Sequence, residues 1–125
     1  MSVKTFGYGD SEWEHAKSEV CDILRELARD FGSTIAYSEL VGRVQAIKLH
    51  QQSPALAGML EQISTSEDAA GRGMLSVLVV HKSGDLRPGR GFFDLAQRLG
   101  RDVSDEDAFW VGELKKVHDS WVSAT

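Results

Sequence analysis

The chain has 125 residues, 42% of them hydrophobic and 26% charged, a composition that fits one globular domain spanning residues 1–125. Its formal net charge of −5 argues against nucleic-acid binding driven by overall charge, and no stretch approaches the roughly 20 apolar residues of a membrane helix. Cys21 is the only cysteine, which excludes an internal disulfide, and with no apolar leader at the N-terminus we expect a cytoplasmic protein without a membrane partner.

Residues 1–10 contain two glycines and show no periodicity, so we expect a loose N-terminal segment. A long helix is predicted over residues 11–30. Ser11 and Glu14 have the spacing of a capping box, and Gly32 follows the helix where a left-handed conformation favours glycine. The apolar residues at helical spacing are Trp13, Ala16, Val20, Ile23, Leu24, Leu27 and Phe31.

A short extended piece and two helices are predicted next. Residues 34–37 are extended, residues 38–44 form a short helix, and residues 45–52 show no clear period. Ser53 and Pro54 mark a helix start, because serine caps the first turn and proline fits the first helical position. We expect this helix to cover residues 54–63 and to be followed by a polar loop.

The longest apolar run covers Leu75 to Val80 and is bounded by glycines. Such a run predicts a buried strand at about 74–81. We expect Leu78 to lie in the interior, packed by the helix over residues 11–30. Turn residues at 82–85 and 88–91 then predict a wing-like loop in which the chain reverses.

Two further helices complete the chain. Apolar spacing predicts one over residues 91–99 and one over about 105–122, where Ser104 and Asp107 have capping-box spacing. The last helix carries an apolar stripe of Trp110, Leu114, Val117 and Trp121. A small domain needs its tryptophans for its own core, so we expect the stripe to dock internally and the protein to be a monomer rather than a homodimer.

The predicted fold class is α+β, mostly helical and winged-helix-like, with a small sheet centred on the strand at 74–81. Positive charge is concentrated around that strand: residues 70–101 carry six basic and two acidic side chains, a balance of +4. Arg72, Lys82, Arg87 and Arg90 are the predicted nucleic-acid contacts, because they stand beside turn residues, where side chains reach solvent and phosphates. A solvated loop that balances acidic helices is the alternative.

Two segments carry a resemblance to a known family. Ser33-Thr-Ile-Ala-Tyr-Ser-Glu-Leu and Leu78-Val-Val-His-Lys-Ser-Gly-Asp-Leu resemble the T-x-Y-x-x-L and V-V-x-S-x-G-x-L segments of the alkylguanine-DNA alkyltransferases and alkyltransferase-like proteins. The resemblance covers about residues 19–86 and implies the C-terminal winged-helix domain of that family, which binds DNA. The run from Leu75 to Phe93 is also similar to small bacterial proteins.

The chain departs from the alkyltransferase pattern at the chemistry. The family's Pro-Cys-His-Arg active site falls near residues 74–78, where this chain has no cysteine, so alkyl transfer is not implied. The family's recognition helix carries an arginine, whereas residues 54–63 contain no basic side chain and include Glu61. Phosphates would be repelled there, so we do not expect this helix to read bases.

No nucleophile motif, metal-ligand spacing or cofactor fingerprint is present. We therefore expect a non-enzymatic module without a metal or cofactor. Two function classes remain. The first is weak contact with the nucleic-acid backbone through the basic wing, with little sequence preference. The second is a protein-interaction or assembly module that uses the C-terminal helix.

Overall fold

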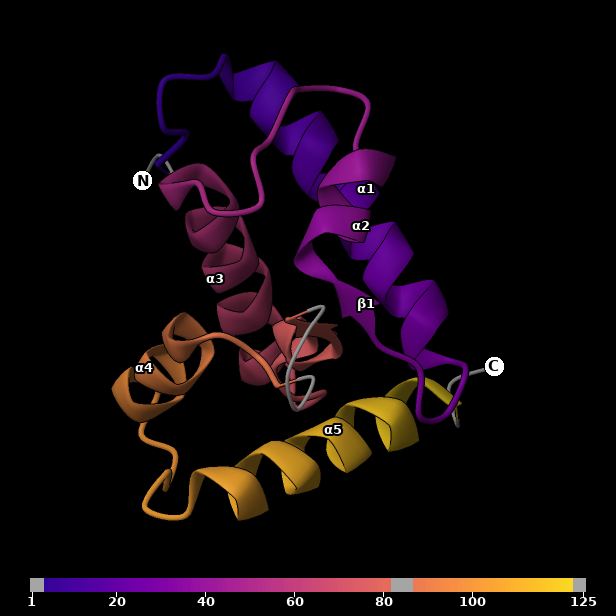
Figure 1. The fold of residues 1–125 in the computed structure, drawn as a ribbon, viewed down its shortest axis with the longest axis vertical. Coiled ribbons are helices and arrows are strands. Elements are labelled where there is room, and N and C mark those ends of the chain that lie inside the picture. Colours follow the sequence, from indigo (N-terminus) through magenta and orange to yellow (C-terminus); the bar gives the residue numbers. More distant parts are fainter. Residues whose placement is uncertain (1–3, 82–86, 123–125) are drawn as a thin grey trace.

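The computed structural model describes residues 4–81 and 87–122. In chain order the elements are α1 (Asp10–Ala28), β1 (Ile35–Ala36), α2 (Tyr37–Arg43), α3 (Pro54–Ala69), the 3₁₀ helix η1 (Leu75–Leu78), β2 (Val79–Val80), α4 (Arg90–Arg98) and α5 (Glu106–Val122). Figure 1 shows α1 and α3 on opposite sides of the molecule, with α5 crossing its lower end. The expectation of a mostly helical α+β fold with a small sheet is confirmed.

The central apolar run is buried, but most of it is not a strand. Its first four residues form η1, and only the last two are extended, so the strand predicted over 74–81 is wrong in its first half. η1 packs against α1, α3 and α5. Because it is enclosed on all sides, its sequence lacks the alternation that would distinguish a strand from another buried conformation. Leu78 is fully buried, as expected.

The sheet consists of two very short strands. β2 pairs in parallel with β1, with Ile35 opposite Val79 and Ala36 opposite Val80. A parallel pair needs a long crossover between its strands, and here α2 and α3 provide it. The sheet therefore joins the segment before α2 to the segment that precedes the predicted wing.

α1 follows its predicted apolar period but not its predicted ends. The buried residues are Trp13, Ala16, Val20, Leu24 and Ala28. The capping box is absent, because the helix begins one residue before Ser11 and Gly9 is the N-cap, without a side-chain cap. Phe31 was expected on the apolar stripe, but it is 64% exposed. The helix ends at Ala28 and the chain then turns, with Gly32 at φ +88°.

α3 begins as predicted, since the Ser53 hydroxyl accepts a hydrogen bond from the Leu56 N–H at 3.2 Å. It then continues to Ala69, beyond its expected end at residue 63. Its second half buries two polar residues, Ser64 and Glu67, which bond to other side chains inside the fold. Residues 64–69 were therefore predicted as a loop because they are polar, although they form a helix with an inward-facing side.

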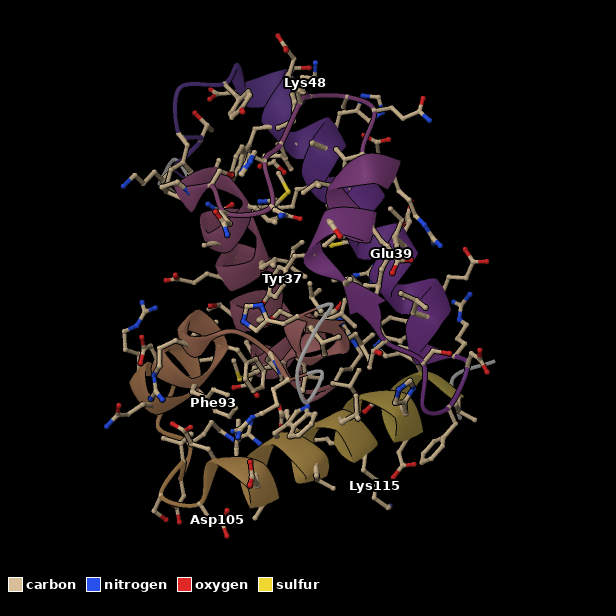
Figure 2. All side chains as sticks on the ribbon, in the orientation of Figure 1. Tyr37, Glu39, Lys48, Phe93, Asp105 and Lys115 are labelled. Atoms are coloured by element: carbon tan, nitrogen blue, oxygen red, sulfur yellow. The ribbon has the colours of Figure 1, made fainter. Side chains whose placement is uncertain are left out.

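α4 and α5 lie where apolar spacing places them, within one residue at each end. At the start of α5 the cap differs from the prediction, because the Asp105 carboxylate, not Ser104, accepts the Ala108 N–H at 3.1 Å. Val117 is buried, while Trp110 and Trp121 are partly covered by the core. On the outer face of the helix, Lys115 points away from the molecule (Figure 2). None of the helices in the described ranges is long and apolar enough to cross a bilayer.

Candidate functional site

The predicted basic residues do not form one surface. Arg87 and Arg90 lie at the start of α4, beside the beginning of α5, where both contact the Glu106 carboxylate. Arg87 also pairs with Asp107 at 2.8 Å, and Arg90 with Asp94 at 3.2 Å. Three described carboxylates therefore contact these two guanidiniums. Lys82 lies outside the described residues.

Arg72 lies at the other end of α5. Its guanidinium carbon is 5.4 Å from the ring centroid of Trp121, whereas Arg87 and Arg90 contact Glu106, the first residue of the same helix. At a rise of about 1.5 Å per residue, the two positions are separated by roughly 22 Å of helix. Arg72 therefore belongs to a different part of the surface from Arg87 and Arg90.

Three arginines surround Trp121. The guanidinium carbons of Arg25, Arg29 and Arg72 lie 5.3, 5.9 and 5.4 Å from its ring centroid, within the range of cation–π attraction. Arg25 lies in the last turn of α1 and Arg29 follows that helix, while Arg72 follows α3. We call Arg25, Arg29 and Arg72 the arginine cluster.

One buried carboxylate belongs to this cluster. Glu67, which is 2% exposed, accepts hydrogen bonds from Arg25 Nε at 3.2 Å and Arg25 Nη2 at 2.9 Å, and a further one from Arg72 Nε. Hydrogen bonding to Glu67 raises the pKa of Arg25, although burial opposes the shift. Asp22 acts on Arg25 more weakly, without direct contact. The three guanidiniums and the one carboxylate that they contact sum to +2.

The cluster is rich in hydrogen-bond donors and poor in acceptors. A guanidinium has five N–H donors and no acceptor, and Glu67 uses two N–H groups of Arg25 and one of Arg72. Within the described ranges, Arg29 makes no ion pair and the indole N–H of Trp121 is buried without a partner. The arrangement is suited to an anionic ligand, which supplies acceptors.

Arg98 and Arg101, by contrast, are matched by carboxylates. Arg101 pairs with Asp68 at 2.7 Å and with the buried Glu113 at 2.5 Å, and Glu113 also accepts the Met74 N–H at 2.7 Å. Arg98 pairs with Glu61 at 2.7 Å. The contacts of the buried Glu113 join Arg101, α5 and the segment before η1, which is a structural role, whereas the Arg98–Glu61 pair is exposed and contributes little to stability.

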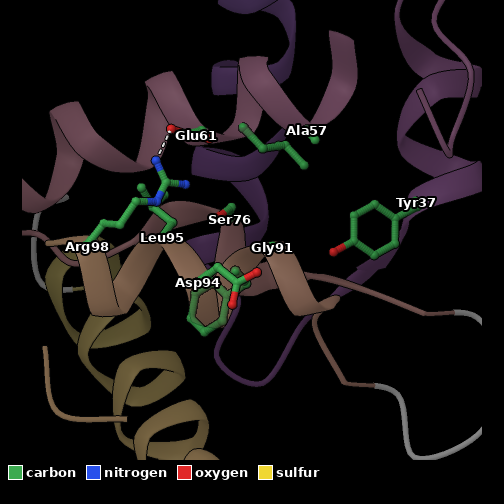
Figure 3. Close-up of a pocket in the computed structure, with 10 residues that line it drawn as sticks. Tyr37, Ala57, Glu61, Ser76, Gly91, Asp94, Leu95 and Arg98 are labelled. Atoms are coloured by element: carbon green, nitrogen blue, oxygen red, sulfur yellow. Dashed lines mark hydrogen bonds and ion pairs between the residues drawn. The ribbon is translucent and has the colours of Figure 1, made fainter. Parts of the chain in front are cut away.

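A pocket of about 210 Å³ lies between α3, α4 and the start of α2. Its lining residues are Tyr37, Ala57, Leu60, Glu61, Ser76, Gly91, Phe92, Asp94, Leu95 and Arg98. In Figure 3 the Tyr37 hydroxyl points toward α4, while the Arg98–Glu61 ion pair lies across the opposite side. The hydroxyl accepts the Gly89 N–H at 2.9 Å, and burial raises the pKa of the phenol.

This pocket contains no cysteine among its lining residues. Cys21, the only cysteine of the chain, lies on α1, and burial raises the pKa of its thiol. A raised pKa lowers the thiolate fraction and with it the nucleophilicity. The residues that would be needed for alkyl transfer are thus not assembled. In the described ranges no group of three His, Cys, Asp or Glu side chains could hold a metal ion.

Comparisons of the chain with protein-family models, with curated proteins and with solved structures find no match. The assignment of the site therefore rests on geometry and charge. Sequence analysis included Arg72 but missed Arg25, Arg29 and Trp121. The four-residue spacing of Arg25 and Arg29 places them on one helix face and could have indicated a pair. No sequence spacing indicates that Arg72 and Trp121 meet them.

Proposed function

We propose that this protein is a non-enzymatic, winged-helix-like nucleic-acid-binding module of the cytoplasm that contacts backbone phosphates through the arginine cluster. The observation that carries the proposal is the local excess of guanidiniums over carboxylates around Trp121. Arginine is well suited to this contact, because its planar fork binds phosphate oxygens in a bidentate manner.

The charge distribution favours backbone contact over base recognition. The cluster carries +2 within a chain of net charge −5, so a nucleic acid is attracted to a restricted surface. Basic or amide side chains are what most often read base edges in the major groove. α3 has no basic residue in its 16 positions, and its one amide side chain, Gln62, is bonded to Trp13, Lys17 and Lys4. Binding is therefore weak, sensitive to salt and nearly independent of sequence.

The basic wing takes a secondary place in this proposal. Arg87 and Arg90 already contact Glu106, and their other partners, Asp107 and Asp94, are exposed. Exposed ion pairs are weak, so a phosphate could replace them, but the same carboxylates repel it. Arg29 has no such competitor within ion-pair distance among the described residues.

Binding of a labelled oligonucleotide, measured by fluorescence anisotropy at about 50 and 200 mM salt, tests the proposal. The variant Arg29→Gln with Arg72→Gln removes two charges from the cluster, and Arg87→Gln with Arg90→Gln removes two from the wing. We expect the first to reduce affinity and to lower the salt slope by about 2, roughly one per lost phosphate contact. Loss of binding only in the second variant would place the contact at the wing. Absence of binding by the unmodified protein at low salt would refute the proposal.

A protein-interaction module that uses α5 is the second candidate function. Val111 on α5 is 59% exposed and Val122 is 41% exposed, so the outer face of this helix presents apolar surface to solvent. Sedimentation of the unmodified protein and of Val111→Asp tests for association through that face. A dimer that the substitution dissociates would favour this function and contradict the expected monomer.

A further inference from the structure

We infer that the arginine cluster is a site for a phosphomonoester dianion, so that the module prefers the phosphorylated end of a nucleic-acid strand to the internal phosphodiesters. This inference rests on the proposed function and specifies which chemical group of the nucleic acid the same site binds. Three features of the cluster carry it: the grouping of its guanidiniums, their charge, and the hydrogen-bond donors that remain available.

The three guanidiniums are grouped around one indole ring. All three lie within 6 Å of the centroid of one indole ring, and two of them bind the same carboxylate. Phosphates along a strand follow one another at about 3.4 Å of helix axis each, and a surface that tracks them needs cations spread along that line. A compact group of cations suits one anion that can be approached from several sides. The terminal phosphate of a strand has this accessibility.

The charge of the cluster matches a dianion. Arg25, Arg29 and Arg72 with Glu67 sum to +2, whereas a phosphomonoester carries about −1.5 to −2 near pH 7 and an internal phosphodiester carries a single charge. The additional charge of the terminal phosphate therefore has a counterpart in the site. An internal phosphodiester, with a single negative charge, would leave part of the positive charge of the site unneutralised.

The available donors match the oxygens of a terminal phosphate. Glu67 occupies only three N–H groups of the cluster, and the remaining N–H groups of Arg25 and Arg72 and all those of Arg29 are not used by described ion pairs. A phosphomonoester presents three strong acceptor oxygens, one more than the two unbridged oxygens of a diester. Hydrogen bonds from a guanidinium to a phosphate oxygen are charge-assisted and therefore stronger than neutral ones.

Three oligonucleotides of one sequence test the inference: one with hydroxyl groups at both ends, one with a 5′-phosphate and one with a 3′-phosphate. We expect either phosphorylated strand to bind about fivefold more tightly, because one additional charge at contact distance is worth about 1 kcal/mol in water. Arg29→Gln should abolish the preference for the phosphorylated strands. Arg29→Lys should retain part of this preference, because lysine keeps the positive charge but lacks the planar, bidentate guanidinium. Arg98→Gln, which removes an equal charge at the pocket in Figure 3, should leave the preference intact.

The other outcomes are distinguishable. Equal affinity for all three strands overturns the inference but leaves the proposed function standing, whereas absence of binding to every strand overturns both. A preference that survives Arg29→Gln overturns the assignment to the cluster. Inorganic phosphate that competes as well as the phosphorylated strand would make free phosphate the ligand, and a phosphopeptide that competes better would make it a protein. Either result overturns the nucleic-acid assignment.

Discussion

Arg25 and Glu67 lie on different helices and form an ion pair, with 2.9 Å between Nη2 and Oε1. The carboxylate is buried while the guanidinium is partly exposed, so the pair joins the interior to the surface at the ends of α1 and α3. Glu67 thereby fixes one side of the arginine cluster and neutralises one of its three charges. The same residue stabilises the fold and limits the positive charge available to a ligand.

Replacing Glu67 with glutamine should separate these two effects. We expect the free energy of unfolding to fall by about 1–3 kcal/mol, since Arg25 and Arg72 lose a charged partner but remain partly solvated. The affinity for a phosphorylated oligonucleotide should rise, because the local charge increases from +2 to +3. Urea denaturation and anisotropy measure the two quantities. Glu61→Gln, which affects only the surface pair with Arg98, should change neither by much, and an unchanged affinity in Glu67→Gln would contradict the account.

Leu78→Ala should cost about 2–5 kcal/mol, the range for a large-to-small change in a closed core. Leu78 is fully buried in η1, the segment on which α1, α3 and α5 meet. Thermal or urea unfolding followed by circular dichroism provides the measurement. Val111→Ala on the exposed face of α5 is the matched control and should stay within about 0.5 kcal/mol. Equal effects of the two substitutions would show that η1 is not the centre of the core.

Gly58→Ala and Gly112→Ala should have opposite effects on the stability of the fold. A Cβ at Gly58 in α3 would overlap the Phe6 ring, whereas a Cβ at Gly112 in α5 meets nothing within 4 Å. Alanine in a helix interior is favoured over glycine by about 1 kcal/mol, so Gly112→Ala should stabilise the protein. Gly58→Ala should displace Phe6 and expose residues 4–8, which limited proteolysis of the N-terminal segment detects. Equal stabilisation by both changes would contradict the packing of Phe6 on α3.

The reactivity of Cys21 should depend on pH in a defined direction. Burial raises the pKa of the thiol, so the folded protein holds this proton more tightly than the unfolded chain does. The resulting contribution to stability is complete below the ordinary thiol pKa and is lost as the pH rises through the raised value. Alkylation by iodoacetamide, followed by mass spectrometry from pH 7 to 10, should show a higher midpoint in the native protein than in urea. A native midpoint equal to or below that in urea would contradict the buried environment of Cys21.

The sequence predicted the elements whose apolar residues repeat with a clear period. α1, α4 and α5 lie close to their expected positions, and the Ser53 cap of α3 is confirmed. The second half of α3 was missed because its inward residues, Ser64 and Glu67, are polar and gain their partners only in the folded chain. η1 was taken for a strand because a fully enclosed segment has no polar face to reveal its period.

The candidate site was harder to predict than the fold. The charge balance of residues 70–101 drew attention to Arg72, but it grouped that residue with its neighbours along the chain. In the folded protein Arg72 joins Arg25 and Arg29 around Trp121, while Arg87 and Arg90 meet the acidic start of α5. A charge count along the sequence does not include carboxylates that tertiary contacts bring close. Those carboxylates decide which guanidiniums have their charge neutralised.

The three tryptophans provide the most direct test of the proposed nucleic-acid contact. Trp121 is surrounded by the arginine cluster, and the Trp110 ring centroid lies 5.6 Å from the guanidinium carbon of Arg87. The Trp13 indole N–H bonds to Gln62 at 3.1 Å, and among the described contacts Trp13 meets neither arginine group. Their indole N–H signals in a ¹H–¹⁵N correlation spectrum therefore report on separate parts of the protein. On titration with a 5′-phosphorylated oligonucleotide, the Trp121 signal should shift most and the Trp13 signal should stay in place. A shift confined to Trp110, with Trp121 unchanged, would contradict the assignment and place the contact at the wing.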